Sequence, residues 1–400
     1  MNECIICKTE SVVELLDVGM QPISNRFAVD PAGEEYLYPM VIGQCNACGL
    51  IQIINPVPAS ELLPPYEWIR YNEAEGHLDK LVDIITLLSG ITKDATICGI
   101  SYKEDSTLAR LRQRGFNHTW RIDTASDLGI TDAGAGIETI QDRIRPDLAS
   151  VLWQKYGAPD VVIARHILEH AHDTPRFMET LHQLVKPTGY VVFEVPDCTR
   201  VLETFDYTTI WEEHILYFTP ETFRHCFGFG GFSLVRFECY PYPYENSLVG
   251  IVQPQTAATP AFPSESVLEN EKRRAQAFAQ GLLQRRHTLS RFFSEYRENQ
   301  GKVAMFGAGH LACMFINLME LKDYIEFIVD DDSNKKGLFM PGSRLPIYGS
   351  DALIQENINL CLTSLSPESE EKVIQKNQAF LDQEGKFASI FPASQHALQV

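Results

Sequence analysis

Two pairs of cysteines constrain the first part of this chain more than any other feature of its sequence. Cys4 and Cys7 form one C-x₂-C pair, and Cys45 and Cys48 form a second pair 37 residues further along. Each pair can bring two thiolates to one metal ion from a tight turn, and two pairs complete the tetrahedral shell of structural zinc. A complete shell has no open position, so we expect this zinc to stabilise the fold rather than to perform chemistry. Four unrelated buried cysteines are the alternative interpretation.

The charge balance excludes some partners. The 400 residues include 53 Asp and Glu against 34 Lys and Arg, a formal net charge of −19, and the basic residues form only short runs. We therefore expect no nucleic-acid partner. The chain begins without a secretory signal pattern, and no segment approaches the ~18 apolar residues of a membrane helix. Ten cysteines in such a chain indicate metal ligands or reduced thiols, so we expect a cytoplasmic protein with no membrane partner.

The middle of the chain alternates between strand-like and helix-like segments. Helical spacing of apolar residues marks 79–89, 107–114 and 176–185, and apolar strand-like runs occur at 95–100, 119–122, 160–164 and 189–195. Strands that alternate with helices are typical of a parallel, doubly wound α/β sheet. The sequence therefore predicts a central Rossmann-like domain.

A second α/β segment follows a linker. Residues 253–263 are rich in Pro, Ala and Thr, and a long charged amphipathic helix is expected at 265–299. Then come a strand at 302–306, a Gly-rich turn, an apolar helix to 319, a strand at 324–329 and a last strand at 359–362. We expect three domains, with boundaries at 1–70, 71–253 and 264–400.

Four motifs, in this order, resemble one family. ARHILEH occupies 164–170 and begins at the last residue of the strand at 160–164. EEHILYFTPETF occupies 212–223, VAMFGAGH occupies 303–310, and IVDDDSNKKGLFMPGSRLPI occupies 328–347. Together with the cysteine pairs, they resemble the three-domain sugar C-methyltransferases. Those enzymes use S-adenosylmethionine (SAM) to methylate a carbon of a nucleotide-linked keto-deoxysugar. The resemblance covers nearly the whole chain and implies a zinc domain, a class I methyltransferase domain and a C-terminal Rossmann-like domain.

The resemblance also implies roles for particular side chains. His214 falls on the histidine that is expected to remove the proton α to the sugar ketone, and Glu213 is placed to orient it. His170 falls on a second active-site position near the methyl donor. A tyrosine between the zinc and SAM domains is expected to face the sugar, and both Tyr66 and Tyr71 satisfy this position. A hydrogen-bonded structural histidine is the alternative for His170 and His214.

The donor-binding turn departs from the family pattern. The family's first strand ends in a Glu-x-Gly-x-x-x-Gly turn, whereas residues 99–105 read GISYKED, with Gly99 at the acidic position and Ser101 at a glycine. In one hypothesis Glu104 and Asp123 still hold SAM in an altered loop, with His166 as a further donor contact. In the other hypothesis the side chains of the turn crowd the pocket and methyl transfer is lost.

Candidates for binding the sugar nucleotide come from two further places. The FGAGH turn follows a strand and opens an apolar helix, so its backbone N–H groups are suited to a phosphate. The alternative is a tight turn that needs glycine only for packing. The resemblance implies that Gly307, Gly309 and His310 contact the nucleotide-sugar. Asn246 is a further candidate, because it lies where the family tends to have His-Gly-Gly-Ser.

These observations lead to one main hypothesis and its rivals. The main hypothesis is a SAM-dependent C-methyltransferase with an atypical donor loop, which contains structural zinc and acts on a nucleotide-linked keto sugar. The first rival is a homologue that binds nucleotide-sugars without methylating them. The second is an enzyme of the same fold that uses another donor. The sequence does not indicate an oligomeric state.

Overall fold

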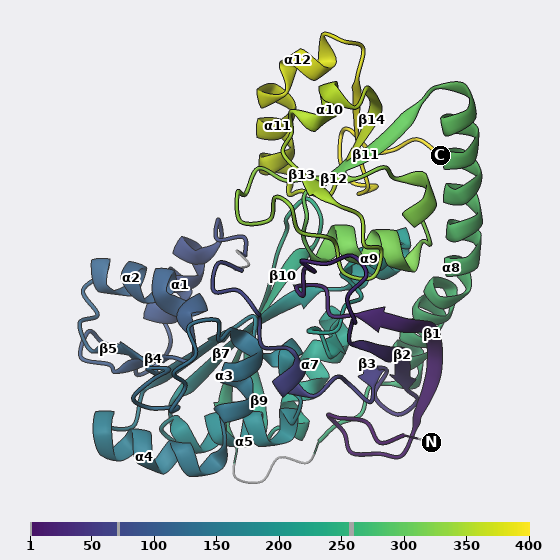
Figure 1. The fold of residues 1–400 in the computed structure, drawn as a ribbon. Coiled ribbons are helices and arrows are strands. Elements are labelled where there is room, and N and C mark those ends of the chain that lie inside the picture. The colour runs from purple at the N-terminus through teal and green to yellow at the C-terminus, as the bar shows by residue number, and fades with distance from the viewer. Residues whose placement is uncertain (1, 70–72, 256–259) are drawn as a thin grey trace. The chain divides into compact units, whose positions relative to one another are not determined.

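The computed structural model describes residues 2–69, 73–255 and 260–400 (Figure 1). Tyr71, one of the two candidate tyrosines, lies outside these ranges. The chain forms two compact units, each built from several stretches of sequence. Unit 1 contains Met1–Glu14, Ile42–Thr199 and Glu213–Arg273, and unit 2 contains Leu15–Val41, Arg200–Glu212 and Arg274–Val400. No helix among the described residues is both long enough and apolar enough to cross a membrane.

A small four-stranded sheet follows the first cysteine pair. Its strands are β1 (Val12–Pro22), β2 (Leu37–Cys45), β3 (Ile51–Ile54) and β8 (Leu216–Tyr217), in that spatial order. All four residues of β3 are buried, and Ile51 lies opposite Tyr217 of β8. The second cysteine pair lies at the end of β2 and in the turn that leads to β3. Residues 2–65 therefore form strands and turns, with one short helix, η1 (Ala59–Glu61).

Unit 1 is built around a six-stranded sheet. Its order is β5-β4-β6-β7-β10-β9, and the first four strands are parallel. The strands are β4 (Ile97–Gly99), β5 (Thr119–Arg121), β6 (Val161–Arg165), β7 (Tyr190–Asp197), β9 (Phe232–Tyr240) and β10 (Asn246–Pro254). The four predicted parallel strands are confirmed. The antiparallel strands β9 and β10, which complete one edge of the sheet, were not predicted.

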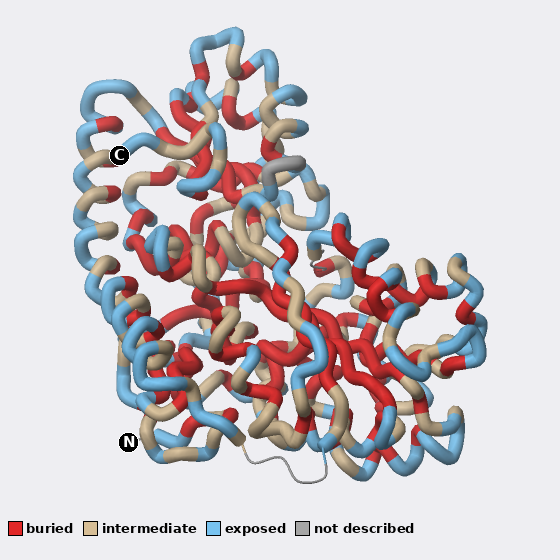
Figure 2. Tube along the Cα trace, turned by 180° about the vertical axis from the view of Figure 1, so that it is seen from behind, coloured by how far each residue is buried: buried red, intermediate tan, exposed pale blue. Residues whose placement is uncertain are grey.

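Helices cover both faces of this sheet, so it is doubly wound. On one face, buried Ile97, Ile163 and Val192 pack against helices α1 and α2. On the other face, Phe193 contacts Phe227 of helix α7 at 5.5 Å between ring centroids. The central strands β6 and β7 are buried over their whole length (Figure 2). The α-helices of this unit are α1 (Leu78–Thr86), α2 (Asp105–Gln113), α3 (Ile137–Arg143), α4 (Pro146–Tyr156), α5 (Thr174–Leu184) and α7 (Pro220–Phe229).

Unit 2 contains a second, wholly parallel sheet. Its order is β13-β12-β11-β14-β15, which is the 3-2-1-4-5 arrangement of a Rossmann-like domain. The strands are β11 (Lys302–Phe306), β12 (Ile328–Val329), β13 (Ile347–Tyr348), β14 (Ile358–Thr363) and β15 (Lys386–Ser389). The α-helices that lie within this unit are α6 (Thr199–Thr204), whose first residue belongs to unit 1, α9 (His310–Leu318), α10 (Ala352–Gln355), α11 (Pro367–Lys376) and α12 (Gln378–Leu381).

Two expectations for this part of the chain were wrong. The strand predicted at 324–329 is shorter, because residues Lys322–Tyr324 form the short helix η5 and only Ile328–Val329 pair in the sheet. The strand at 359–362 is not the last, because β15 follows it and pairs with it in parallel. The helix predicted at 265–299 is confirmed as the single 35-residue helix α8 (Glu265–Asn299).

Candidate active site and zinc centre

The four N-terminal cysteines lie together, as their spacing predicts. Their Sγ atoms are all within 4.8 Å of one another, with 3.7 Å between Cys4 and Cys48 and 3.6 Å between Cys7 and Cys45. Zinc–sulfur bonds of ~2.3 Å in a tetrahedron place sulfur atoms about 3.8 Å apart. The cysteines therefore fit a Cys₄ zinc site.

Polar groups around the cysteines support thiolates. The hydroxyl of Thr9 lies 3.0 Å from the Cys7 sulfur, and the hydroxyl of Ser11 lies 3.1 Å from the Cys45 sulfur. The backbone N–H of Cys48 also donates to the Cys45 sulfur at 3.4 Å. Such donors stabilise the negative charge of metal-bound sulfur and fix its orientation.

A buried ionic network occupies the carboxyl ends of β6 and β7. Arg165 ends β6 and is 1% exposed, and its Nε lies 2.5 Å from Oε2 of Glu194 in β7, which is fully buried. Oε1 of Glu194 also accepts from Ser247 at 2.8 Å and lies 3.1 Å from both His77 and His166. Burial alone would raise the pKa of Glu194, but the neighbouring cations hold it well below its ordinary value. This carboxylate is therefore ionised and fixed in place.

His166 is the residue that follows this strand. It has a positive φ of 47°, an unusual conformation for a residue with a side chain and one that is found at functional sites. Its Nδ1 lies 3.5 Å from Glu169 and 4.0 Å from Glu73. Burial lowers the pKa of His166, but Glu73, Glu169 and Glu194 more than offset this and raise it to about 10. His166 is therefore an imidazolium at neutral pH.

The turn after β4 is closed by its own glutamate. Glu104 belongs to the short helix η2 (Tyr102–Glu104), and its Oε2 accepts from the N–H of Ser101 at 2.5 Å. Its Oε1 accepts from the N–H of Arg165 at 2.7 Å. A Cβ on Gly99 would lie only 2.8 Å from Cβ of Glu104. Glycine is therefore needed at residue 99 to admit Glu104, which ties the turn to β6.

The remaining side chains of the turn have partners nearby. Lys103 pairs with Glu73 at 2.7 Å, and Asp105 pairs with Arg121 of β5 at 2.9 Å. Asp123, just after β5, is exposed and accepts from the N–H of Ser126 at 2.7 Å. This donor lowers the pKa of Asp123, so its carboxylate is ionised. An exposed, ionised carboxylate at the end of the second strand fits the ribose hydroxyls of SAM.

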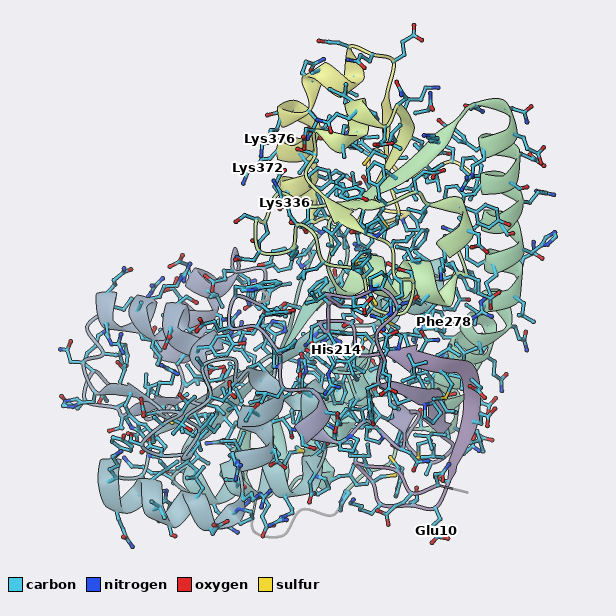
Figure 3. All side chains as sticks on the ribbon, viewed as in Figure 1. Glu10, His214, Phe278, Lys336, Lys372 and Lys376 are labelled. Carbon is cyan, nitrogen blue, oxygen red and sulfur yellow. The ribbon has the colours of Figure 1, made fainter. Side chains whose placement is uncertain are left out.

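Two of the candidate catalytic histidines lie in contact. The rings of His170 and His214 meet edge to face, with 4.7 Å between their centroids (His214 is labelled in Figure 3). His170 belongs to the short helix η3 (Leu168–His170), which follows β6, and His214 precedes β8. The ligand atoms of Glu138, His170 and Glu213 lie within 4.8 Å of one another. The structure thus brings together three of the predicted catalytic residues, His170, Glu213 and His214.

Two further candidates lie in separate surroundings. The ring of Tyr66 stacks on that of Trp68, with 5.0 Å between centroids. Asn246, the first residue of β10, donates from its Nδ2 to Asp197 at 2.9 Å. Its Oδ1 is buried and has no hydrogen-bond partner in the described part of the chain. Asn246 therefore keeps one acceptor for a ligand.

The glycine-rich turn of unit 2 contains two glycines in different situations. A Cβ on Gly307, whose φ is 101°, would lie 2.8 Å from Ser364, whereas a Cβ on Gly309 would meet no atom within 4 Å. Oδ2 of Asp330 already accepts from the N–H of Ala308 at 2.8 Å. Packing of the turn therefore requires Gly307. The space beside Gly309 is open among the described residues, although its N–H already donates to the carbonyl of Gly307 at 3.0 Å.

His310 begins α9 next to this turn. Its ring stacks on that of Trp211, which also belongs to unit 2, with 4.1 Å between centroids and 23° between planes. A stacked pair of flat rings at a helix N-terminus suits a ligand with both a phosphate and a planar group.

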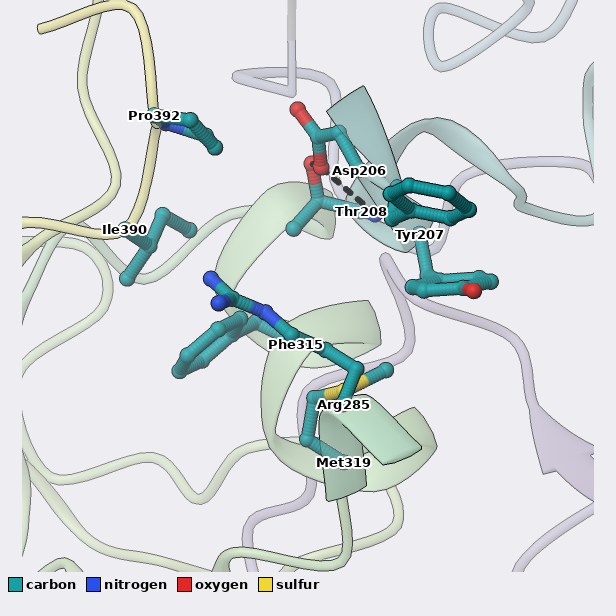
Figure 4. A pocket seen from close by; sticks show the side chains of 9 residues that line it. Asp206, Tyr207, Thr208, Arg285, Phe315, Met319, Ile390 and Pro392 are labelled. Atoms are coloured by element: carbon teal, nitrogen blue, oxygen red, sulfur yellow. Dashed lines mark hydrogen bonds between the residues drawn. The ribbon is translucent and has the colours of Figure 1, made fainter. Parts of the chain in front are cut away.

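A pocket elsewhere in unit 2 contains none of the predicted residues. The side chain of Arg285 reaches into it, close to Asp206 and Phe315 (Figure 4). Burial raises the pKa of Asp206. The residues that line this pocket are Phe205, Asp206, Tyr207, Thr208, Arg285, Phe315, Met319, Ile390 and Pro392. The candidate catalytic histidines, His170 and His214, belong to unit 1, so this pocket is not the candidate active site.

Three family models match successive parts of the chain. A zinc binding domain matches residues 4–62, a methyltransferase domain matches 73–236, and a C-methyltransferase C-terminal domain matches 261–392. The C-methyltransferase NovU of Streptomyces niveus is 23% identical over 409 residues, which cover 98% of this chain and 96% of that protein. The chain matches all three parts of a three-domain C-methyltransferase, in order. It is a SAM-dependent methyltransferase, and zinc and SAM are its cofactors.

Solved structures are more distant from this C-methyltransferase. A 1,6-didemethyltoxoflavin N1-methyltransferase of Burkholderia thailandensis is 13% identical, with 45% of this chain and 79% of that chain covered and a TM-score of 0.31. An O-methyltransferase family protein of the same species is 18% identical, with 44% and 56% covered and a TM-score of 0.28.

Several charged residues of the site were not predicted from the sequence. Arg165 and Glu169 lie inside the ARHILEH motif, so their position between two candidate histidines was a signal that could have identified them. Glu73, Glu138 and Glu194 carry no local signal, because each reaches the site only through the packing of its element.

Proposed function

We propose that this C-methyltransferase methylates the carbon α to the ketone of a nucleotide-linked keto-deoxysugar. The observation that supports this proposal is the contact between His170 and His214, flanked by buried carboxylates, just beyond the carboxyl end of β6. The curated relative is named a C-methyltransferase, and a carbon α to a ketone becomes a nucleophile only after it loses a proton. Two adjacent imidazoles supply a base and an acid for that step.

In the proposed mechanism, His214 takes the proton from the α-carbon. The electron pair of the broken C–H bond moves toward the ketone oxygen, and Glu213 orients His214 for this step. SAM, when bound, supplies the methyl group as part of a sulfonium ion. The ketone reforms as the α-carbon accepts the methyl group, and the proton leaves His214 to solvent. Holding the α-carbon in line with the methyl group can remove several kcal/mol of barrier.

On the donor side, Asp123 would bind the two ribose hydroxyls. The backbone at Gly99 and Ser101 would face the donor, with Glu104 holding this turn and His166 supplying a fixed positive charge near the methionine carboxylate. Lys103 pairs with Glu73, and Asp105 pairs with Arg121. The turn therefore accommodates both side chains without being disrupted. This arrangement supports the first of the two hypotheses for the altered loop.

On the acceptor side, the backbone at Gly309 and the ring of His310 would bind the nucleotide. Gly307 would contribute through the shape of the turn. Asn246 would accept a hydrogen bond from a sugar hydroxyl through its free Oδ1, and Tyr66 or Tyr71 would face the sugar. Both tyrosine assignments stay open as proposals.

The test uses SAM with a panel of nucleoside-diphosphate-linked keto-deoxyhexoses. We expect one of them to give a product heavier by one CH₂, together with S-adenosylhomocysteine. His214→Ala should reduce turnover by at least ~100-fold while the affinity for SAM changes less than about twofold. In deuterated water without SAM, the wild-type protein should exchange the α-proton of the acceptor, and His214→Ala should not.

A matched control is His118→Ala, which removes an exposed histidine of unit 1. It should turn over like the wild type. Turnover by His214→Ala at the wild-type rate would remove His214 from the role of base. A protein that binds SAM but methylates no member of the panel would contradict the proposed acceptor class.

A further inference from the structure

A second carboxylate lies behind the histidine pair. Glu138 of α3 is 3% exposed, and its Oε1 lies 2.6 Å from Nδ1 of His170, which is 6% exposed. Oε2 of Glu138 is buried without a hydrogen-bond partner in the described part of the chain. An isolated buried carboxylate is costly, so the pairing with His170 determines its charge state.

His170 is surrounded by charged and titratable groups on several elements. Besides Glu138 on α3, they are Glu169 on η3, with Oε1 at 4.0 Å from Nε2, Lys103 on η2, and Glu213 and His214 before β8. Glu138 lies closer to a ring nitrogen of His170 than Glu169 does, at 2.6 Å against 4.0 Å. Burial and Lys103 lower the pKa of His170, but Glu138, with a smaller contribution from Glu169, more than offsets this and raises it above the ordinary value.

We propose that Glu138 is a positioning residue that holds His170 as an imidazolium beside the base His214. The contact at Nδ1 leaves the Nε2–H of His170 to donate to the ketone oxygen. This inference rests on the proposed function and assigns the acid that the reaction requires. Glu138 itself does not contact the acceptor in this scheme.

His214 and His170 together account for the proton and the electron pair of this step. The α-C–H bond breaks as a bond from hydrogen to nitrogen forms on His214, and the electron pair passes to the ketone oxygen. The Nε2–H of His170 donates a hydrogen bond to that oxygen while its charge is negative. When the carbon takes the methyl group, the carbonyl double bond returns and His170 keeps its proton. A fixed cation at a developing oxyanion contributes more than a mobile donor in water.

The test is Glu138→Gln, which preserves the size of the side chain and an acceptor for Nδ1–H but removes the negative charge. Without that charge, His170 should lose its proton at a lower pH. We expect the alkaline limb of the kcat profile to move at least one pH unit lower. We expect kcat at pH 8 to fall at least ~10-fold, with KM changed less than about twofold.

A direct readout does not depend on turnover. In protein labelled with nitrogen-15 at histidine, the His170 resonance should titrate at a lower pH in Glu138→Gln than in the wild type. Glu138→Asp should restore most of the wild-type titration, because it restores the charge. Asp142→Asn is the control, since Asp142 lies on the same helix and its side chain is 44% exposed, beside Arg145.

The two readouts separate this inference from the proposed function. An unchanged His170 titration in a folded Glu138→Gln protein would overturn the inference. A shifted titration with an unchanged pH profile would also overturn it, because His170 would then not act in the reaction. If no keto sugar is methylated by the wild type, the proposed function fails, and the titration still decides whether Glu138 sets the charge of His170.

Discussion

Arg165 and Glu194 illustrate how single residues stabilise the carboxyl edge of the central sheet. Both are almost fully buried, and each is the principal counter-charge of the other. Replacing one partner of such a pair leaves an uncompensated buried charge, which typically costs about 3–5 kcal/mol. His77, His166 and Ser247 add further contacts to Glu194, so its orientation is determined from several elements. The side chains at the carboxyl edge of the central sheet are therefore fixed in place.

The raised pKa of His166 makes the stability of this edge depend on pH. A histidine whose pKa is about 10 in the folded protein and ~6.5 when unfolded stabilises the fold fully below pH 6.5. This contribution is lost as pH rises through 10, at up to about 1.4 kcal/mol per pH unit. We expect the urea midpoint of the wild type to fall between pH 7 and pH 9, by the equivalent of about 2 kcal/mol.

The comparison that tests this dependence is His166→Gln, which lacks the titrating group. Its urea midpoint should be lower at pH 7 and should change less between pH 7 and pH 9 than that of the wild type. His118→Gln, at an exposed position, should follow the wild-type curve. Parallel curves for the wild type and His166→Gln would mean that His166 is not protonated in the folded protein.

At the scale of elements, the turn between β4 and α2 depends on close packing around Gly99. We expect Gly99→Ala to displace Glu104 and to destabilise the protein by about 1–3 kcal/mol. Gly136→Ala is the matched control, because a Cβ at residue 136 would meet no atom within 4 Å and its φ is −109°. Urea unfolding followed by fluorescence measures both variants. Equal stability of the two alanine variants would show that Glu104 does not require the glycine.

Elements with strong local periodicity were predicted well, and those defined by distant pairing were not. The helix at 265–299 and the strand at 302–306 match α8 and β11, because amphipathic spacing and an apolar run determine them locally. β12 was predicted too long, since its two residues are defined by pairing with β11 and β13. Glu138 was not predicted as a site residue, because only the packing of α3 brings it to His170.

The residues of the candidate site also divide into those that local sequence identifies and those that only distant packing brings together. The four cysteines are set by the spacing within each C-x₂-C pair, so sequence alone identified them, and the structure brings them together. The ionic network of Arg165, Glu194 and His77 joins three elements that are far apart in sequence. No local pattern distinguishes such charges from solvated ones, and only the buried position reveals them.

At the scale of the whole molecule, zinc, the methyl donor and the acceptor have separate tasks. The Cys₄ shell offers no open position, so zinc contributes to stability and not to the transfer of the methyl group. We expect Cys45→Ser to lower the zinc content from about one equivalent to near zero and to lower the unfolding temperature by at least about 5 °C. The affinity for SAM should change less than about twofold, because the proposed donor contacts, Asp123 and the 99–105 turn, follow strands of a different sheet.

Elemental analysis, thermal unfolding and calorimetric titration with SAM measure these three quantities on the 400-residue chain. Cys239→Ser is the control, since Cys239 is exposed on β9 and lies outside the cluster, and it should keep its zinc. If Cys45→Ser keeps a full equivalent of zinc, the ligand set is wrong. If removal of zinc abolishes SAM binding while circular dichroism shows an intact central domain, the metal acts at the donor site and is not only structural.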